Sequence, residues 1–147
     1  PSKEQVRNYT LVLKGHLAIA MAKFPVGTTG EQLDVLARQY LWQAGLDYNH
    51  GTGHGVGHFL GVHEGPQAIS KNPTRVVLEE NMILSNEPGY YQEGKYGIRI
   101  ENLVRVIKSK TKGFLEFQTL TQVPYDHKLI DKKLLTKEEL KFIRAYQ

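Results

Sequence analysis

Residues 82–106 read MILSNEPGYYQEGKYGIRIENLVRV, with two apolar runs on either side of a segment rich in glycine and tyrosine. Met82–Pro88 and Ile98–Val106 are rich in apolar and β-branched residues, which predicts two strands. Residues 89–97 between them contain glycines and few aliphatic side chains, which predicts a turn-rich link. The stretch therefore predicts an antiparallel hairpin centred near Gly94.

This hairpin places two glutamates opposite one another. A turn centred near Gly94 pairs residues whose numbers sum to 188, so Glu87 opposes Glu101 and Asn86 opposes Asn102. Opposed Cβ atoms on antiparallel strands lie about 5 Å apart, where like charges repel. Two carboxylates are stable there only if one is protonated or a cation lies between them.

The ligand chemistry narrows the choice of cation. Carboxylate oxygens suit Mn²⁺, Mg²⁺ or Ca²⁺, and an added imidazole shifts the preference toward Mn²⁺, Co²⁺, Fe²⁺ or Zn²⁺. The alternative is that Arg99, on the same face as Glu101, neutralises a solvent-facing pair. That alternative suits Glu87 less well, because apolar residues precede it and Pro88 follows.

A source of imidazole lies upstream, where four of the six histidines fall within residues 50–63 and glycine occupies every odd position from 51 to 57. A helix would place His50, His54 and His58 on one face, but each of its four glycines would cost about 1 kcal/mol relative to alanine. In an extended chain His50 and His54 are about 13 Å apart, so at most one binds a given ion. The other is then free to contact substrate or to move a proton. The alternative is a glycine-rich surface loop with incidental histidines.

The rest of the chain predicts helices before the hairpin and one after it. Ser2 caps a first helix, with Gln5 as its capping-box partner, and a second helix runs from Thr29 or Gly30 to about Ala44. Phe114–Val123 reads as a further strand, and Thr136 opens a terminal helix. The expected inward-facing side chains are Val6, Tyr9, Leu13, Leu17, Ala20 and Met21 in the first helix, Leu33, Leu36, Ala37, Tyr40 and Leu41 in the second, and Leu140, Ile143 and Ala145 in the last. The pattern predicts an α+β fold with helices on one face of an antiparallel sheet and the site on the other.

Composition excludes several classes of protein. At 147 residues, of which 40% are hydrophobic, the chain has the size of a single domain, and it lacks the run of about 20 apolar residues that would span a membrane. Without cysteine it forms no disulfides or thiolate zinc sites, which is compatible with a cytoplasmic location. The net charge of +4 comes from dispersed lysines, concentrated only near residues 108–112 and 128–137, so we expect no nucleic-acid partner.

Four blocks carry a resemblance to a known family: HGTGHGVGH at residues 50–58, VHEGP at 62–66, NEPGYY at 86–91 and YGIRIEN at 96–102. In this order they resemble aminopeptidase P, a pita-bread metallopeptidase related to prolidase and methionine aminopeptidase. The resemblance implies a curved antiparallel sheet with helices on its outer face. It covers residues 1–147 as one domain, the C-terminal part of the catalytic domain, with a family-specific tail from about 120 to 147. The VHEGP block and this tail favour aminopeptidase P over prolidase and the cytosolic branch of the family.

The resemblance assigns roles to individual residues. It implies that His54 is the imidazole metal ligand and that Glu87 and Glu101 are the glutamate ligands, with Glu101 bridging two metals. Glu87 also matches the general base. His50 matches a histidine that lines the substrate pocket, and His63 matches one that contacts the scissile peptide group and the tetrahedral intermediate.

Other positions are assigned supporting roles. We expect His58 and Arg99 to support the metal ligands without binding the metal themselves, and we expect Arg99 to orient Glu101. Tyr90 is expected to bind substrate, and Tyr90, Tyr91 and Tyr96 are candidates for the walls of a proline slot, although ordinary hairpin packing is the alternative for at least two of them.

The implied activity is hydrolysis of the N-terminal residue from peptides with proline second, at a centre of two Mn²⁺ ions, with Zn²⁺ or Co²⁺ as alternatives. In the family two further ligands are aspartates from upstream strands, for which this chain has no counterpart. The chain begins at Pro1 without methionine, so we expect it to be the C-terminal part of a longer protein, inactive alone and binding metal weakly. A homodimer is also expected. A prolidase-type dipeptidase and a non-catalytic peptide-binding module are the alternatives, and the retained His54, Glu87 and Glu101 favour an enzyme over the module.

Overall fold

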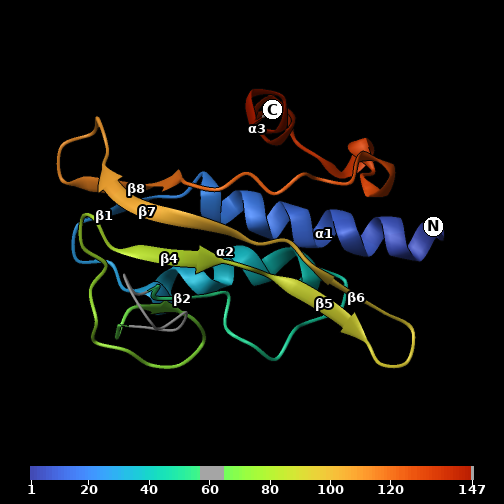
Figure 1. Ribbon diagram of the computed structural model, residues 1–147, viewed down its shortest axis with the longest axis horizontal. Helices are drawn as coiled ribbons and strands as arrows, with labels where there is room; N and C mark the ends of the chain where they lie inside the picture. The colour runs from blue at the N-terminus through green and yellow to red at the C-terminus, as the bar shows by residue number, and fades with distance from the viewer. Residues whose placement is uncertain (57–64, 147) are drawn as a thin grey trace.

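The computed structural model describes residues 1–56 and 65–146 and has an α+β architecture (Figure 1). In chain order the elements are α1 (Lys3–Ala20), β1 (Lys23–Pro25), α2 (Gly30–Gln43), β2 (Gly53–His54), β3 (Ala68–Ile69), β4 (Ile83–Asn86), β5 (Gly89–Gln92), β6 (Tyr96–Arg99), β7 (Asn102–Lys108), β8 (Phe114–Thr119), the 3₁₀ turns η1 (His127–Leu129) and η2 (Lys132–Leu134), and α3 (Lys137–Tyr146). None of the helices in these two ranges is both long and apolar enough to cross a membrane.

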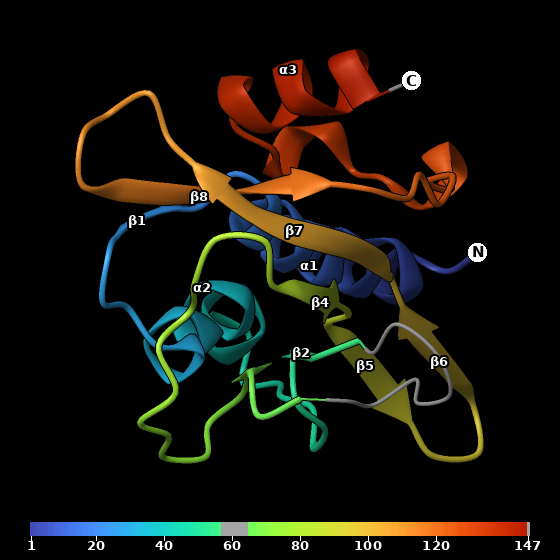
Figure 2. The ribbon, with the colours of Figure 1, turned by 60° about the vertical axis from the view of Figure 1, so that its left-hand side comes forward.

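Helix α1 is the central helix of the molecule. The predicted capping box is confirmed, since the Ser2 side chain accepts from Gln5 N and the Gln5 side chain accepts from Ser2 N. Helices α2 and α3 lie on opposite sides of α1, so its burial extends beyond one apolar stripe (Figure 2). Met21, expected to face inward, is 39% exposed because it follows the last helical residue.

The main sheet has four antiparallel strands in the order β1-β8-β7-β4. Its first strand was not predicted: Lys23–Pro25 pairs with Phe114–Glu116. A core of buried side chains fills the space between this sheet and helices α1 and α2. Its largest members include Ile19, Phe24, Leu33, Leu78, Leu84, Val104 and Phe117.

The predicted hairpin register is confirmed. Asn86 pairs with Asn102 in the β4–β7 ladder, and Tyr90 pairs with Ile98 in β5–β6, so both ladders keep the sum of 188. The expected link is mostly strand, because β5 and β6 continue the hairpin as a projecting arm (Figure 1). The ladders are interrupted at residues 87–88 and 100–101, and the two glutamates lie in these gaps.

One register across both ladders fixes the direction of side chains, because successive residues of a strand point to opposite faces. Odd-numbered residues of the hairpin face the glycine-rich segment, and even-numbered residues face α1. Ile100, for example, is buried in a second core cluster together with Leu13 and Leu17 of α1. The two carboxylates and the two asparagines beside them therefore lie on opposite faces.

The C-terminal segment packs along α1 and completes the second core cluster. The capping box that opens α3 is confirmed by reciprocal bonds between Thr136 and Glu139. Ile143 is buried as expected, but Ala145 is exposed, and Phe142 and Tyr146 pack against the cluster instead. Phe114–Thr119 is a strand, and the predicted continuation to residue 123 is not.

Candidate metal centre

The glycines of the histidine segment allow it to lie directly against β4. A Cβ atom on Gly53 would lie 2.0 Å from the backbone oxygen of Ser85, so only glycine fits there. Gly55 forms an isolated bridge with Leu84, and Val56 N donates to Ile83 O at 3.1 Å. His54 N donates to Ser85 Oγ at 3.0 Å. These contacts hold the His54 backbone beside the strand that ends at Glu87.

His54, Glu87 and Glu101 each contribute a ligand atom to one cluster. The three atoms lie within 4.8 Å of one another, and His54 Nε2 is 3.1 Å from Glu87 Oε2. His50 is outside this cluster, as expected from the length of an extended chain between it and His54. Three segments far apart in the sequence thus converge on one point.

A neighbouring carbonyl sets the orientation of the His54 ring. His54 Nδ1 lies 3.0 Å from Gly55 O, and because a carbonyl only accepts, Nδ1 carries the proton of this bond. The other nitrogen, Nε2, is directed at the carboxylates with its lone pair available in the neutral ring. A metal-binding histidine has this arrangement, in which one nitrogen donates to a fixed acceptor and the other faces the ion.

The two carboxylates lie close enough for the charge of Glu87 to affect Glu101. The pKa of Glu101 is raised, first by burial and then by the charge of Glu87 and hydrogen bonding to it, while Arg99 and His54 act in the opposite direction. Glu87 is only 8% exposed. One imidazole and two facing carboxylates suit a divalent cation, which would remove the repulsion between them.

His50 lies beside Tyr91 and Arg99. Its Nε2 is 2.8 Å from the Tyr91 hydroxyl, and Arg99 Nε donates to the same oxygen at 2.8 Å. Tyr91 is 42% exposed, so this trio forms a solvent-accessible wall next to the carboxylates. Arg99 contacts Tyr91 and acts on Glu101 through its charge, which lowers the pKa of that carboxyl group.

A buried polar network beneath the histidine segment was not predicted. Arg38 of α2 is 1% exposed and binds Asp34 Oδ2 at 2.6 Å, and it also donates to the backbone oxygens of Tyr48 and His50. Asp34 accepts in turn from the Thr52 hydroxyl at 2.7 Å. The network fixes the backbone on both sides of Gly51. Opposite charges at i and i+4 beside the apolar face of the second helix were the available sequence signal.

The expectation for Tyr90 does not fit this arrangement. Tyr90 is even-numbered, and its ring packs against the second core cluster, 6.3 Å from the ring of Tyr96. Tyr96 binds Asn8 and Glu4 of α1 through its hydroxyl group. Of the three tyrosines, Tyr91 is the one beside His50. His58 and His63, assigned supporting and catalytic roles, lie outside the described residues.

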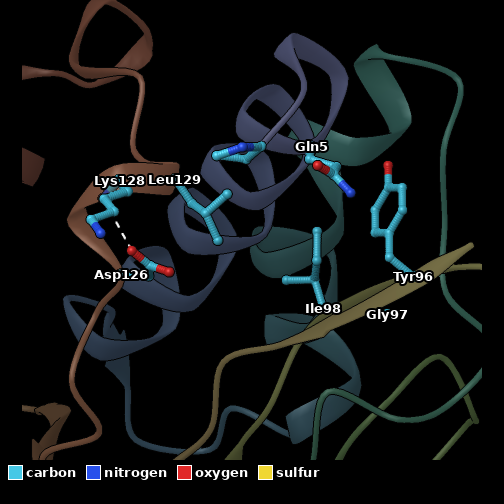
Figure 3. A pocket seen from close by; sticks show the side chains of 8 residues that line it. Gln5, Tyr96, Gly97, Ile98, Asp126, Lys128 and Leu129 are labelled. Carbon is cyan, nitrogen blue, oxygen red and sulfur yellow. Dashed lines mark hydrogen bonds between the residues drawn. The ribbon is translucent and has the colours of Figure 1, made fainter.

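A separate pocket of about 330 Å³ lies between the start of α1, β6 and η1. Tyr96 and Ile98 reach it from β6, Gln5 reaches it from α1, and Asp126 and Leu129 border it from the C-terminal segment (Figure 3). It contains none of the three candidate ligands and is lined from the even-numbered face of the hairpin. The cluster of candidate ligands and this pocket are therefore separate sites.

Comparison with known proteins identifies relatives over the whole chain. Residues 1–108 match the model of metallopeptidase family M24, and residues 113–147 match the C-terminal region of peptidase M24. A probable Xaa-Pro aminopeptidase P of Fusarium vanettenii is 56% identical over 99% of this chain, and aminopeptidase P1 of Lotus japonicus is 49% identical over 99%. These matches cover 25% and 23% of the two relatives, so the chain spans about a quarter of their length.

Solved structures give the same picture. The X-prolyl aminopeptidase of Caenorhabditis elegans, described as a cytosolic enzyme with a di-nuclear active site, matches with a TM-score of 0.95 and 49% identity, over 99% of this chain and 24% of that one. Prolidase from Pyrococcus furiosus matches with a TM-score of 0.73 and 32% identity, over 85% of this chain and 34% of that one.

Proposed function

Because the chain belongs to metallopeptidase family M24, we propose that it is the C-terminal part of the catalytic domain of an Xaa-Pro aminopeptidase. This enzyme would remove the N-terminal residue from peptides with proline second. The observation that carries the proposal is the convergence of His54, Glu87 and Glu101 within 4.8 Å, in a chain that is 56% identical to a probable Xaa-Pro aminopeptidase P.

The proposed ligands are His54 Nε2 and the carboxylates of Glu87 and Glu101, with Glu101 as the bridge if two ions are present. A di-nuclear centre in the complete protein is supported by the nature of the C. elegans enzyme, and Mn²⁺ fits the mixed oxygen and imidazole set, with Zn²⁺ or Co²⁺ as alternatives. When bound, such ions supply Lewis acidity and make water a nucleophile at neutral pH.

The residues of this chain then act on the water and the substrate. Glu87, which is mostly buried and 3.1 Å from His54 Nε2, is proposed to accept a proton from an attacking water and to pass it on. His50, held by Tyr91, forms a wall of the substrate pocket. His63 is proposed to contact the scissile peptide group and His58 to support the ligands.

The substrate preference has a physical basis. A bond before proline is a tertiary amide that lacks an N–H group, so backbone hydrogen bonding of the ordinary kind cannot select it. An apolar slot that accepts the pyrrolidine ring must provide the selectivity. We assign one wall of this slot to Tyr91, which is 42% exposed, and to His50, whose ring centroid lies 5.4 Å from that of Tyr91.

Two alternatives remain distinguishable. A prolidase-type dipeptidase is less well supported, since the match to the P. furiosus prolidase has a lower TM-score and identity than the match to the C. elegans aminopeptidase. A non-catalytic peptide-binding module would not require three converging ligands. A cytoplasmic location, a homodimer and a lack of membrane or nucleic-acid partners complete the proposal, and the first is supported by the cytosolic C. elegans enzyme.

The test uses a polypeptide in which this chain follows the remaining three quarters of the Fusarium relative. With Mn²⁺ it should hydrolyse an Xaa-Pro-Xaa peptide, act poorly on an Xaa-Ala-Xaa peptide, and lose activity in Glu101→Gln. The 147-residue chain alone should bind Mn²⁺ weakly and show no appreciable hydrolysis. Hydrolysis of free dipeptides only would favour prolidase, and unchanged function in Glu101→Gln would favour the binding module.

A further inference from the structure

The residue beside each candidate ligand in the hairpin is an asparagine that points to the opposite face. Asn102 follows Glu101 and is 2% exposed, and its partner in the ladder, Asn86, precedes Glu87 and is completely buried. Both asparagine side chains face α1 rather than the cluster of His54, Glu87 and Glu101. Buried polar side chains require hydrogen-bonding partners, so these two must be held by particular neighbours.

Asn102 has its full set of partners. Its Oδ1 accepts from the Thr121 hydroxyl at 2.8 Å and from Val123 N at 2.9 Å. Its Nδ2 lies 3.1 Å from the Tyr146 hydroxyl and 3.3 Å from His16 Nε2. A primary amide accepts two bonds and donates two, so all of its capacity is used.

Three of these four partners come from the C-terminal segment. Thr121 and Val123 follow β8, and Tyr146 is the last residue of α3. The Tyr146 hydroxyl also donates to Val123 O at 2.5 Å, and its ring stacks on Tyr125 with centroids 4.3 Å apart. The end of α3 is thus joined to the residue that follows Glu101.

The backbone at Glu101 depends on such support. Ile100 and Glu101 lie in the gap between β6 and β7, where no strand ladder holds the chain. Ile100 N donates to Pro88 O at a long 3.3 Å. The next regular pair is Asn86 with Asn102, so Asn102 is the first residue after Glu101 that a strand ladder holds, and its side chain adds bonds to the C-terminal segment.

We propose that Asn102 is a positioning residue for Glu101, and that residues 120–146 act on the metal centre through it by way of Tyr146. The proposal rests on the proposed metal-binding role of Glu101. It gives the C-terminal segment a part in metal binding besides its packing against α1.

A pair of tyrosine variants separates positioning from packing. Tyr146→Phe removes the hydroxyl group that contacts Asn102 and keeps the stacked ring. Tyr9→Phe is the matched control, since Tyr9 belongs to the same core cluster and its hydroxyl accepts from Asp126 N at 3.0 Å, another attachment of the C-terminal segment. Tyr9 has no contact with Asn102 among the described residues.

The measurement is Mn²⁺ binding to the polypeptide in which this chain follows the remaining three quarters of the Fusarium relative, followed by the electron paramagnetic resonance signal of free Mn²⁺. Tyr146→Phe should weaken binding about ten-fold, the lower end of the range for residues that orient metal ligands, while Tyr9→Phe should bind like the unsubstituted chain. Urea unfolding of both variants shows whether their losses of stability are similar.

The outcomes separate this inference from the proposed function. Weaker binding in Tyr146→Phe than in Tyr9→Phe, at similar stability, supports positioning. Equal Mn²⁺ affinity of the two variants overturns positioning and leaves the metal site intact. Failure of the unsubstituted polypeptide to bind Mn²⁺ overturns the metal site itself, and positioning falls with it.

Discussion

The two faces of one hairpin behave in opposite ways although they share a register. On the odd-numbered face, Glu87 and Glu101 approach each other with too little positive charge nearby, and the pKa of Glu101 is raised by burial and by Glu87. On the even-numbered face, the neighbouring Asn102 uses every hydrogen-bonding position it has. The difference is that Asn102 is fully hydrogen-bonded by residues of this chain, whereas the two carboxylates on the other face would be stabilised by a cation.

The largest expected effect is on catalysis from the odd-numbered face. Glu87→Gln removes a proposed ligand and the proposed base, so kcat of the completed enzyme should fall by about 1,000-fold or more, within the range for loss of a general base. Steady-state hydrolysis of an Xaa-Pro peptide measures it. A loss of less than ten-fold would contradict the role of Glu87, provided that circular dichroism shows an unchanged fold.

The contact between the histidine segment and β4 can be disrupted by a substitution at Gly53. Gly53→Ala places a Cβ atom 2.0 Å from Ser85 O, so the His54 segment must move away from β4. We expect a loss of about 2 kcal/mol in the free energy of unfolding, as for overpacking, together with loss of Mn²⁺ binding. Gly51→Ala is the control, because the nearest atom to its Cβ would be the Cβ of Ser70 at 3.3 Å, and the nearest backbone oxygen, that of Ile69, would be 3.5 Å away. Equal effects of the two substitutions would refute the close-approach argument.

The even-numbered face should determine how stability depends on pH. Burial lowers the pKa of His16 from 6.5 to about 4, and its Nε2 lies 3.3 Å from Asn102 Nδ2. Below pH 6.5 His16 binds a proton in the unfolded chain, but in the folded chain it stays neutral until the pH is about 4. The free energy of unfolding therefore falls as the pH drops through this window. Between pH 7 and 5 the loss from His16 should be about 2 kcal/mol.

Urea unfolding at the two pH values measures this loss, and His16→Gln provides the comparison. The variant should lose most of the dependence, because glutamine does not titrate. An equally steep dependence in His16→Gln would show that other groups are responsible.

The smallest effect concerns the repulsion between the carboxylates. In the absence of metal, Glu101→Gln should raise the free energy of unfolding at pH 7 by about 0.5 kcal/mol, the size usual for accessible charge pairs. The raised pKa of Glu101 means that the charged form is disfavoured in the folded state, so this gain should vanish as the pH falls and Glu101 becomes protonated. Chemical unfolding at pH 7 and 4 checks it, and destabilisation at pH 7 would show that Glu101 has a favourable partner.

The parts of the molecule that follow from local pattern could be predicted. The hairpin register followed from strand alternation and a turn near Gly94, and it placed Asn86 opposite Asn102. The capping boxes at Ser2 and Thr136 are similarly local. The reach of an extended chain predicted only that His50 and His54 would not share one ion, and the family resemblance then selected His54, which is the histidine in the cluster.

The parts of the molecule that depend on packing between distant segments could not be predicted from the sequence. Strand β1 exists because Lys23–Pro25 meets the beginning of β8, more than 80 residues away along the chain. Tyr90 and Tyr91 lie in different surroundings, because the Tyr90 ring packs in the core cluster against α1 and the Tyr91 hydroxyl lies beside His50, and only the position of the helix layer decides this. The link from Tyr146 to Asn102 needs the whole C-terminal segment in place.

The central claim is that His54, Glu87 and Glu101 share one divalent ion. The most direct measurement is anomalous scattering at the manganese edge from crystals of the chain soaked in Mn²⁺. We predict a peak within bonding distance of His54 Nε2 and of one oxygen from each glutamate. A peak elsewhere, or none at a concentration at which the chain binds Mn²⁺ in solution, would contradict it.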